Sequence, residues 1–336
     1  MFLISTRNFP PDVGGIQNLM EGLSNALLNH GPVKVFADNF ENSESYDQTS
    51  KLNIQRISGF KIFKKYRKAN LVKEFINNNN LRAAFFDHWK SIENLDSIVL
   101  KKTKTFCLIH SKEINHPQGS SLNKRMVKAL NKANFIIANS NFTKNLAIKV
   151  GIDQSKINVI FPGINKPINI PESAKAEATT YFMDSFPKII TVARLDKRKG
   201  HDNILMSIKN LKSKYPNIKY ISIGAGKEQE KLFNLAKQLK LEKNVIFLNN
   251  INYDLKTALV SAANLFIMPS RVENKSVEGF GIVFTEAASF GVASIGGKEG
   301  GESDAIIHGE TGLLCDGSDL NSIYESSIKL ESGGYI

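Results

Sequence analysis

The chain has 336 residues, 42% of them hydrophobic and 23% charged, with a formal net charge of +12 and a mean hydropathy of −0.20. This composition excludes intrinsically disordered, collagen-like and coiled-coil proteins, and the length suffices for two domains of ordinary size. No apolar run approaches the roughly 20 residues of a membrane span, and the first five residues are too few and uncharged for a signal peptide, so we expect a cytoplasmic protein.

Short apolar runs alternate along the chain with longer segments of helical periodicity, a pattern typical of parallel sheets flanked by helices. The predicted strands are 1–5, 33–37, 83–86, 105–110, 135–139 and 156–161, followed by 188–193, 219–224, 244–248, 265–268, 293–296 and 312–315. The predicted helices include 17–30, 141–150, 202–214, 229–239, 253–262 and 285–289.

Two runs of about six strands indicate two doubly wound, Rossmann-like α/β domains rather than one oversized sheet. A segment with four prolines separates the two runs. We therefore predict an N-terminal domain over 1–165, a linker over 166–187 and a C-terminal domain over 188–336. Because parallel α/β sheets bind ligands at the carboxyl ends of their strands, we expect the site in a cleft where the two domains face each other.

The excess positive charge lies entirely in the first half. Residues 1–170 hold 24 Lys and Arg against 12 Asp and Glu, whereas residues 171–336 hold 20 of each. Residues 60–73 and 122–134 read as basic amphipathic helices, which bind anionic lipid with about 1 kcal/mol per cation. A solvated helix face is the alternative. Signatures of nucleic-acid binding are absent from the sequence, so we expect no nucleic-acid partner.

Two loops have the residues that bind phosphate. Gly14 and Gly15 directly precede a predicted helix, where unpaired N–H groups face an anion. Arg194 and Lys199 follow the strand 188–193 and suit a diphosphate. The adjacent Lys197 and Arg198 are expected to be solvated.

Another glycine-containing segment resembles a dinucleotide fingerprint but does not complete it. Gly224 and Gly226 follow a predicted strand, and Gln229 stands where a third glycine is needed. We interpret this segment as a strand-end turn and not as a nicotinamide site.

The segment 269–287 has two acids, Glu278 and Glu286, eight positions apart around the sequence GFGIVFT. A helix that begins near Ile282 would leave the amides of Phe280, Gly281 and Ile282 open to a phosphate or sugar oxygen. Carboxylates accept hydrogen bonds from neutral hydroxyl groups, so the pair suits a polyol. The chain has no Asp-x-Asp, EF-hand or histidine-cluster spacing, and we therefore expect no metal ion and no cofactor.

The combined motifs resemble those of retaining nucleotide-sugar glycosyltransferases of family 4, which have the GT-B fold. The motifs are GGIQ, His110 at a strand end, ANSNFTKNL (138–146), ARLDKRKG, IGAGKEQ, EGFGIVFTEA and GGESDAI (300–306). The last two resemble most the bacterial phosphatidylinositol mannosyltransferase-like enzymes, and the resemblance covers nearly the whole chain.

The resemblance implies a role for each candidate residue. Arg194 and Lys199 would neutralise the diphosphate of the donor as it leaves, Glu286 would bind the ribose, and Glu278 would bind a hydroxyl of the transferred sugar. In the C-terminal, donor-binding domain, the backbone of Phe280, Gly281, Ile282 and Val283 would contact sugar and phosphate. Asn250 or Ile251 would contact the edge of the nucleotide base. In the N-terminal, acceptor-side domain, Gly14 and Gly15 would admit the diphosphate and acceptor, and His110 would bind the sugar near the reacting carbon.

The implied activity is metal-independent, retaining transfer of a hexose, of mannose or glucose type, from a GDP- or UDP-sugar to a lipid-linked or saccharide acceptor. Such a reaction belongs to cell-envelope polysaccharide or glycolipid synthesis, with peripheral contact between the N-terminal domain and the inner face of an anionic membrane. The alternatives are a nucleotide-sugar epimerase and a non-catalytic nucleotide-sugar-binding protein. Family members usually continue through further helices past the GETGLL segment, whereas this chain stops soon after 321–330. We therefore expect either a naturally short protein or a C-terminal domain truncated at its end.

Overall fold

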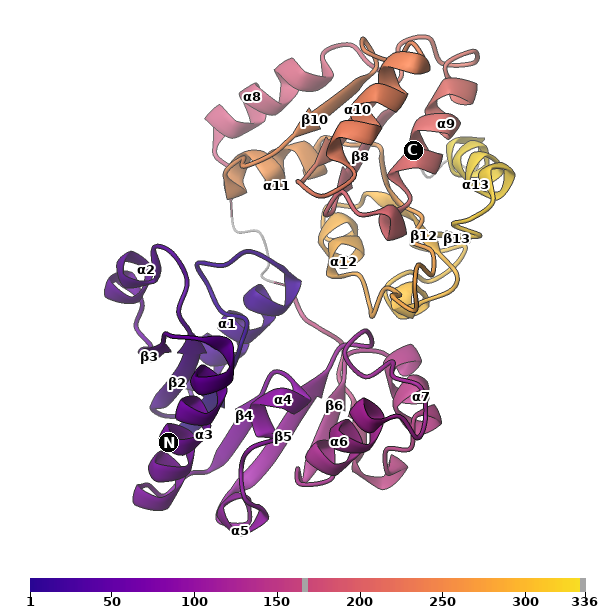
Figure 1. Cartoon of the computed structure of the whole chain (residues 1–336). Coiled ribbons are helices and arrows are strands. Elements are labelled where there is room, and N and C mark those ends of the chain that lie inside the picture. Colours follow the sequence, from indigo (N-terminus) through magenta and orange to yellow (C-terminus); the bar gives the residue numbers. More distant parts are fainter. Residues whose placement is uncertain (165–168, 333–336) are drawn as a thin grey trace. The chain divides into compact units, whose positions relative to one another are not determined.

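The computed structural model describes residues 1–164 and 169–332. Its contacts divide the chain into two compact units, Met1–Gly163 (unit 1) and Ile164–Ile336 (unit 2). Each unit contains one sheet, and every pair of neighbouring strands is parallel (Figure 1). The prediction of two α/β folds with parallel sheets is confirmed.

Unit 1 has seven strands in the order β3-β2-β1-β4-β5-β6-β7. Its elements are β1 (Phe2–Ser5), α1 (Gly15–Leu28), β2 (Val33–Asp38), α2 (Ser43–Thr49), β3 (Asn53–Ile57), α3 (Lys61–Asn78), β4 (Ala83–Phe86), α4 (Trp89–Ile92), α5 (Ser97–Leu100), β5 (Lys104–Ile109), α6 (Ser121–Leu130), β6 (Phe135–Ala138), α7 (Asn141–Lys149), the short 3-10 helix η1 (Gln154–Lys156) and β7 (Ile157–Val159).

The expectation of six strands was wrong for unit 1, because β3 was not predicted. This strand reads NIQRI and lies at the edge of the sheet, where it pairs only with β2. An edge strand buries little of its surface, and β3 has only two apolar residues, Ile54 and Ile57, which are three positions apart and so break the period of two that a strand shows. Its pattern is therefore too weak to separate it from a loop.

Side chains that alternate along the strands of unit 1 divide its core between the two faces of the sheet. Phe86 and Ile109 lie on the face covered by α3, α4, α6 and α7. Ile4 and Leu108 lie on the opposite face, where Met20 of α1 packs. Burial of both faces explains why the central strands are almost continuously apolar.

Unit 2 has six strands in the order β10-β9-β8-β11-β12-β13. Its elements are α8 (Glu172–Phe182), β8 (Lys188–Val192), η2 (Lys197–Lys199), α9 (His201–Leu211), β9 (Lys219–Ile223), α10 (Gln229–Gln238), β10 (Val245–Leu248), α11 (Tyr253–Ser261), β11 (Leu265–Met268), α12 (Ile282–Ala288), β12 (Ala293–Gly297), η3 (Gly301–Asp304), β13 (Gly312–Cys315) and α13 (Leu320–Ser332).

The segment predicted as a linker, 166–187, contains a packed helix. Residues 166–168 lie outside the described part of the chain, but α8 follows, and its Ala174, Ala178 and Phe182 are buried in the core that α11 also lines. The prolines predicted a break between two domains. The alanines are small, so they add little hydrophobic character from which a buried helix face could be predicted. These alanines are nevertheless spaced four apart, which brings them to one face of the helix.

The packing of α8 predicts a large difference between two neighbouring residues. Replacing the buried Phe182 by Ala should lower the free energy of unfolding by about 3–5 kcal/mol, because it leaves a cavity beneath the helix. Replacing the exposed Met183 by Ala should change it by less than about 0.5 kcal/mol. Urea denaturation of the full chain measures the free energy of unfolding of both variants. Equal values for the two variants would contradict the packing of α8.

Candidate functional site

In unit 2 the order of the strands reverses between β8 and β11, so the chain leaves these two adjacent strands in opposite directions. Such a switch point is where open α/β sheets bind ligands. The loop after β8 contains Arg194 and η2, and the loop after β11 leads to Glu278. The two loops are joined by a hydrogen bond of 2.9 Å from the Arg271 amide to the Arg198 carbonyl.

One carboxylate oxygen at this switch point binds two cations. Arg198 Nη1 lies 2.8 Å from Glu278 Oε2, and Lys199 Nζ donates to the same oxygen. The side chains of Arg198 and Lys199 are each 11% exposed and that of Glu278 is 15% exposed. The cluster therefore has one negative and two positive charges at the edge of solvent. The remaining positive charge favours an anionic ligand.

The electrostatic state of Glu278 follows from these contacts. Burial alone would raise the pKa of its carboxyl, but the charges of Lys199 and Arg198 and their hydrogen bonds outweigh burial and lower the pKa to about 2. Glu278 is therefore ionised at neutral pH and can only accept hydrogen bonds. Its remaining lone pairs suit donors such as sugar hydroxyls.

The other predicted residues of unit 2 lie in different surroundings. Arg194 is 68% exposed, and its guanidinium lies 3.2 Å from Asp196. Glu286 lies in the second turn of α12, which begins at Ile282, three residues before the predicted helix 285–289, and its Oε2 is 3.5 Å from Lys256 Nζ of α11. Within the residues that the structure describes, neither Arg194 nor Glu286 forms a hydrogen bond or ion pair with Arg198, Lys199 or Glu278.

The loop that precedes α12 is held by packing. Phe280 is buried, and Gly281 has a φ of +87°, in the left-handed region that favours glycine. A Cβ at Gly281 would also lie 2.6 Å from the Phe284 ring. Ile282 and Val283 are half-buried, and Ile251, after β10, is partly buried against the same core.

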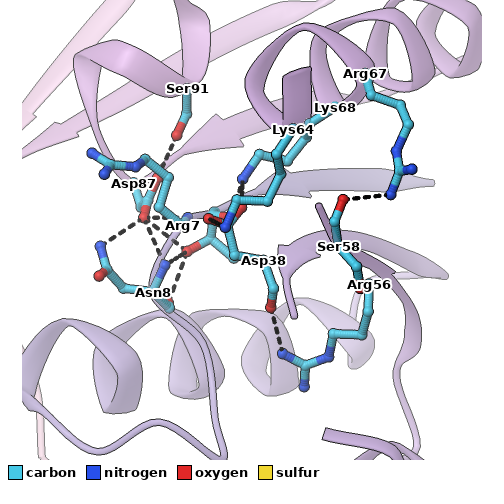
Figure 2. Close-up of polar contacts among 11 residues, drawn as sticks. Arg7, Asn8, Asp38, Arg56, Ser58, Lys64, Arg67, Lys68, Asp87 and Ser91 are labelled. Carbon is cyan, nitrogen blue, oxygen red and sulfur yellow. Dashed lines mark hydrogen bonds and ion pairs between the residues drawn. The ribbon is translucent and has the colours of Figure 1, made fainter. Parts of the chain in front are cut away.

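In unit 1 the switch point lies between β1 and β4, and a buried acid connects the loops that follow these strands. Figure 2 shows Asp87, directly after β4, beside the loop after β1. Asp87 Oδ2 accepts hydrogen bonds from the amides of Arg7 (2.7 Å) and Asn8 (3.2 Å) and from the side chains of Thr6 and Asn8. Ser91 Oγ donates to Oδ1 over 2.7 Å.

A second acid of unit 1 fixes α3 on the sheet. Asp38, at the end of β2, pairs with Lys68 at 2.6 Å and with Lys64 at 2.8 Å (Figure 2). Lys68 is buried and also donates to the Thr6 carbonyl over 2.6 Å. Burial would raise the pKa of Asp87, but Lys68 and the hydrogen bonds outweigh burial and lower it. Asp87 is therefore ionised at neutral pH.

The predicted residues of unit 1 lie near this network or beside it. His110 Nε2 is 3.2 Å from the carbonyl oxygen of Asp87, a contact in which Nε2 donates, so Nδ1 is left as an acceptor. Gly14 precedes α1, and a Cβ there would lie 2.5 Å from the Gln17 side-chain oxygen, whereas a Cβ at Gly15 would meet nothing within 4 Å. The backbone at Gly15 is thus open to a ligand.

Three charged residues at the two switch points, Arg198, Asp87 and Lys68, were not predicted from the sequence to belong to a site. Arg198 was expected to be solvated, but it is nearly buried against Glu278, because η2 turns it and Lys199 toward the same carboxylate. Asp87 and Lys68 were not singled out, although an acid directly after a buried strand was a usable signal. The pairing of Lys68 with Asp38 depends on residues 30 positions apart and left no local pattern.

The two basic stretches are only partly exposed. In α3, Lys64 and Lys68 pair with Asp38, and just after α6, Lys132 donates to the carbonyls of Glu93 and Leu95. At the start of α3, by contrast, four apolar side chains are exposed to solvent: Phe60, Ile62, Phe63 and Tyr66.

Among residues 1–164 and 169–332, no three His, Cys, Asp or Glu side chains are grouped so that they could hold a metal ion. None of the helices in these two ranges has both the length and the apolar character needed to cross a membrane.

The low pKa of Glu278 predicts a pH-dependent contribution to stability. A group whose pKa falls from 4.5 in the unfolded chain to about 2 in the folded one stabilises the fold above pH 4.5 and loses this effect as the pH falls toward 2. Replacing Glu278 by Gln should therefore lower the free energy of unfolding at pH 7 by about 3 kcal/mol, because Lys199 and Arg198 lose their partner.

Urea unfolding at pH 7, 5 and 3 measures this effect, and the deficit of E278Q should shrink between pH 5 and pH 3. The control is Glu273→Gln, which removes the partner of the exposed Lys197 and should cost less than about 1 kcal/mol throughout. A deficit of E278Q that stayed constant down to pH 3 would contradict the prediction.

Comparisons with known proteins cover both units. The family model described as Glycosyltransferase Family 4 matches residues 13–166, and the one described as Glycosyl transferases group 1 matches residues 175–334. The GDP-mannose-dependent alpha-(1-6)-phosphatidylinositol monomannoside mannosyltransferase of Mycolicibacterium smegmatis is 24% identical over 330 residues, 96% of this chain and 86% of that protein. The GDP-mannose-dependent monoacylated alpha-(1-6)-phosphatidylinositol monomannoside mannosyltransferase of Corynebacterium glutamicum is also 24% identical, over 98% of this chain and 88% of that protein.

Solved structures share the fold at lower identity. Anabaena Alr3699/HepE, in complex with UDP and glucose, superposes with a TM-score of 0.79 at 18% identity and covers 100% of this chain and 91% of its own. A glycosyltransferase from Rickettsia africae gives a TM-score of 0.79 at 18% identity, over 98% of this chain and 88% of its own. With family models matched to both units and parallel sheets of seven and six strands, the chain has the GT-B fold and belongs to glycosyltransferase family 4.

Proposed function

We propose that this protein is a retaining hexosyltransferase that moves a sugar of mannose or glucose type from a nucleotide diphosphate sugar to a lipid-linked or saccharide acceptor. The observation that carries the proposal is the Arg198–Glu278–Lys199 cluster at the switch point of unit 2. Its two cations can bind the diphosphate of such a donor, and its carboxylate can accept hydrogen bonds from the hydroxyl groups of the sugar.

The chemistry follows from where charge develops. As the bond from the sugar C1 to the diphosphate oxygen breaks, negative charge gathers on the leaving phosphate, and fixed cations at that oxygen lower the barrier without a metal ion. We assign this role to Lys199 and to the exposed Arg194. The acceptor oxygen then bonds to C1 on the same face, and its proton passes to the leaving phosphate oxygen, so the anomeric configuration is retained.

The remaining residues take the roles expected from the family. We propose that Glu286 binds the ribose and that the backbone of 280–283 contacts sugar and phosphate. We also propose that Ile251 contacts the edge of the nucleotide base. In unit 1 we assign the acceptor to the open backbone at Gly14 and Gly15, and a sugar hydroxyl to His110. The Nδ1 acceptor of His110 supports this assignment, because a hydroxyl can donate to it.

The donor and acceptor are proposed from the named relatives. The two mannosyltransferases use GDP-mannose and act on phosphatidylinositol mannosides, which favours GDP-mannose and a lipid-linked acceptor for this chain. Anabaena Alr3699/HepE is in complex with UDP and glucose, so UDP-glucose is the second donor to test. The reaction would serve the synthesis of a cell-envelope glycolipid or polysaccharide at the cytoplasmic face of a membrane.

We further propose that unit 1 contacts an anionic membrane through the start of α3. Phe60 and Phe63 are 83% and 75% exposed, and Lys65 and Arg67 lie beside them on the same helix. Exposed aromatic rings flanked by cations suit the interface of a bilayer, where rings enter the headgroup layer and cations meet anionic lipid. Such a contact would bring a lipid-linked acceptor to unit 1.

The first test replaces Arg194 by Ala. Each charge-assisted hydrogen bond to the diphosphate contributes about 1.5–3 kcal/mol, so kcat/KM should fall about 10- to 150-fold. Arg194 is chosen because its removal leaves the Glu278 cluster intact. The control is Lys197→Ala, an exposed cation of the same loop, which should keep wild-type activity.

The assay measures release of GDP from GDP-mannose, or of UDP from UDP-glucose, with and without a phosphatidylinositol or saccharide acceptor. Acceptor-dependent release by the wild type supports a transferase. Donor binding without release would instead support a non-catalytic sugar-nucleotide-binding protein, and equal activity of R194A and wild type would remove Arg194 from the site.

The second test measures binding to vesicles of phosphatidylcholine with and without phosphatidylglycerol, at 50 and 500 mM salt. The wild type should bind only the anionic vesicles, and more weakly at high salt. The double variant F60A/F63A should bind at least about tenfold more weakly, because each ring buries apolar area in the interface. Ile98→Ala, an exposed apolar residue on α5 of the same unit, is the control. Unchanged binding by F60A/F63A would refute the membrane contact.

A further inference from the structure

His201 is a buried histidine to which the proposed function gives no role. It is the first residue of α9, and only 1% of its surface is exposed. Its Nε2 lies 3.2 Å from the carbonyl oxygen of Arg194, in the loop after β8. A carbonyl oxygen can only accept a hydrogen bond, so Nε2 carries the proton and donates. His201 therefore joins the start of α9 to the residue that we assign to the diphosphate of the donor.

The other nitrogen of the imidazole meets a buried network of hydroxyl groups. Nδ1 lies 3.2 Å from the Tyr220 hydroxyl and 3.3 Å from Ser222 Oγ, both on β9. Tyr220 donates to Thr191 Oγ1 of β8 over 3.0 Å, and Thr191 donates to the carbonyl of Ile267 in β11. Tyr220, Ser222 and Thr191 are each 0% exposed. The network thus anchors the imidazole to three neighbouring strands of the sheet.

The charge state of His201 agrees with these contacts. Burial lowers the pKa of its imidazole to about 4, so the ring is neutral at pH 7. A neutral ring with its proton on Nε2 has an acceptor at Nδ1, to which the Ser222 hydroxyl can donate. Both ring nitrogens therefore have a partner of the right kind.

Arg194 depends on its main chain for its position. Two other cations of the loop, both in η2, are bound by the carboxylate of Glu278. The side chain of Arg194 is 68% exposed, and its ion pair with Asp196 is weak because water screens it. The Arg194 carbonyl, by contrast, accepts from His201 Nε2 and, over 2.8 Å, from the Asp196 amide. Of these two bonds, the one from His201 ties Arg194 to the core.

We propose that His201 is a positioning residue of the donor site, which holds the main chain of Arg194 so that the guanidinium can bind the diphosphate. The inference rests on the proposed function. A charged group binds most effectively when it is ordered before the ligand arrives, because less conformational entropy is then lost on binding. His201 supplies this order from the core and does not need to touch the donor itself.

The test uses calorimetry to measure the affinity of the full chain for GDP and UDP, which carry the diphosphate without the sugar. Leu removes the hydrogen bond to the Arg194 carbonyl, so H201L should bind the nucleotide about three- to tenfold more weakly. The amide of Gln can donate in place of Nε2, so H201Q should stay within about twofold of the wild type. The control is Ile208→Val, which trims a buried side chain of the same helix and should lower the Tm without changing affinity.

A double variant separates positioning from a general loss of stability. If His201 acts through Arg194, H201L should cost nothing further once Arg194 is replaced, so R194A and R194A/H201L should bind the nucleotide within about twofold of each other. An equal loss from H201L in both backgrounds, or a loss in H201Q or I208V as large as in H201L, would overturn the role of His201 while leaving the proposed function standing. A wild type that binds neither GDP nor UDP would overturn both.

A second measurement does not depend on whether H201L folds. Nitrogen-15 NMR of the wild type at pH 7 distinguishes the two tautomers of a neutral imidazole, and the signals of His201 are those that H201Q lacks. We expect the proton on Nε2. A proton on Nδ1 would leave the Arg194 carbonyl without a donor from the ring and would overturn the proposal, whatever the affinity of the variants.

Discussion

Charges taken out of water at the ends of parallel strands are stable only where opposite charges or N–H and O–H donors meet them, and this requirement shapes both units. In unit 1, Asp87 accepts hydrogen bonds from backbone and side chains, and Asp38 holds two lysines of α3. In unit 2, Glu278 binds Arg198 and Lys199. Each acid thereby fixes the loops that follow adjacent strands, because removing one partner would leave an uncompensated charge.

Most of the fold could be predicted from sequence, because long apolar runs and helical periodicity are local signals. Strands such as β4, β11 and β13 have the predicted bounds. The elements that were missed have weak local signals. The edge strand β3 buries little apolar surface, and α8 buries alanines within a proline-rich segment. In both, packing against a distant part of the chain decides the structure, and periodicity does not report it.

The candidate site was predictable to a smaller extent. Glycines, acids and cations after strands indicated Arg194, Lys199 and Glu278. The side chain that each cation would face was not predictable. Arg198 and Lys197 are neighbours in sequence, yet the 3-10 turn directs Arg198 to Glu278 and Lys197 to the half-buried Glu273.

Main-chain contacts help to fix the loop after β8. Leu195 donates to the Ala225 carbonyl and accepts from the Glu228 amide, both over 3.0 Å, and a Cβ at Gly224 or Gly226 would lie 2.1 Å from Ala193 O or 2.4 Å from Leu195 O. Because these main-chain contacts position the loop, its exposed side chains can vary without altering the path of its backbone. We therefore expect that an exposed residue such as Arg194 can be exchanged without altering the backbone of the loop that carries it.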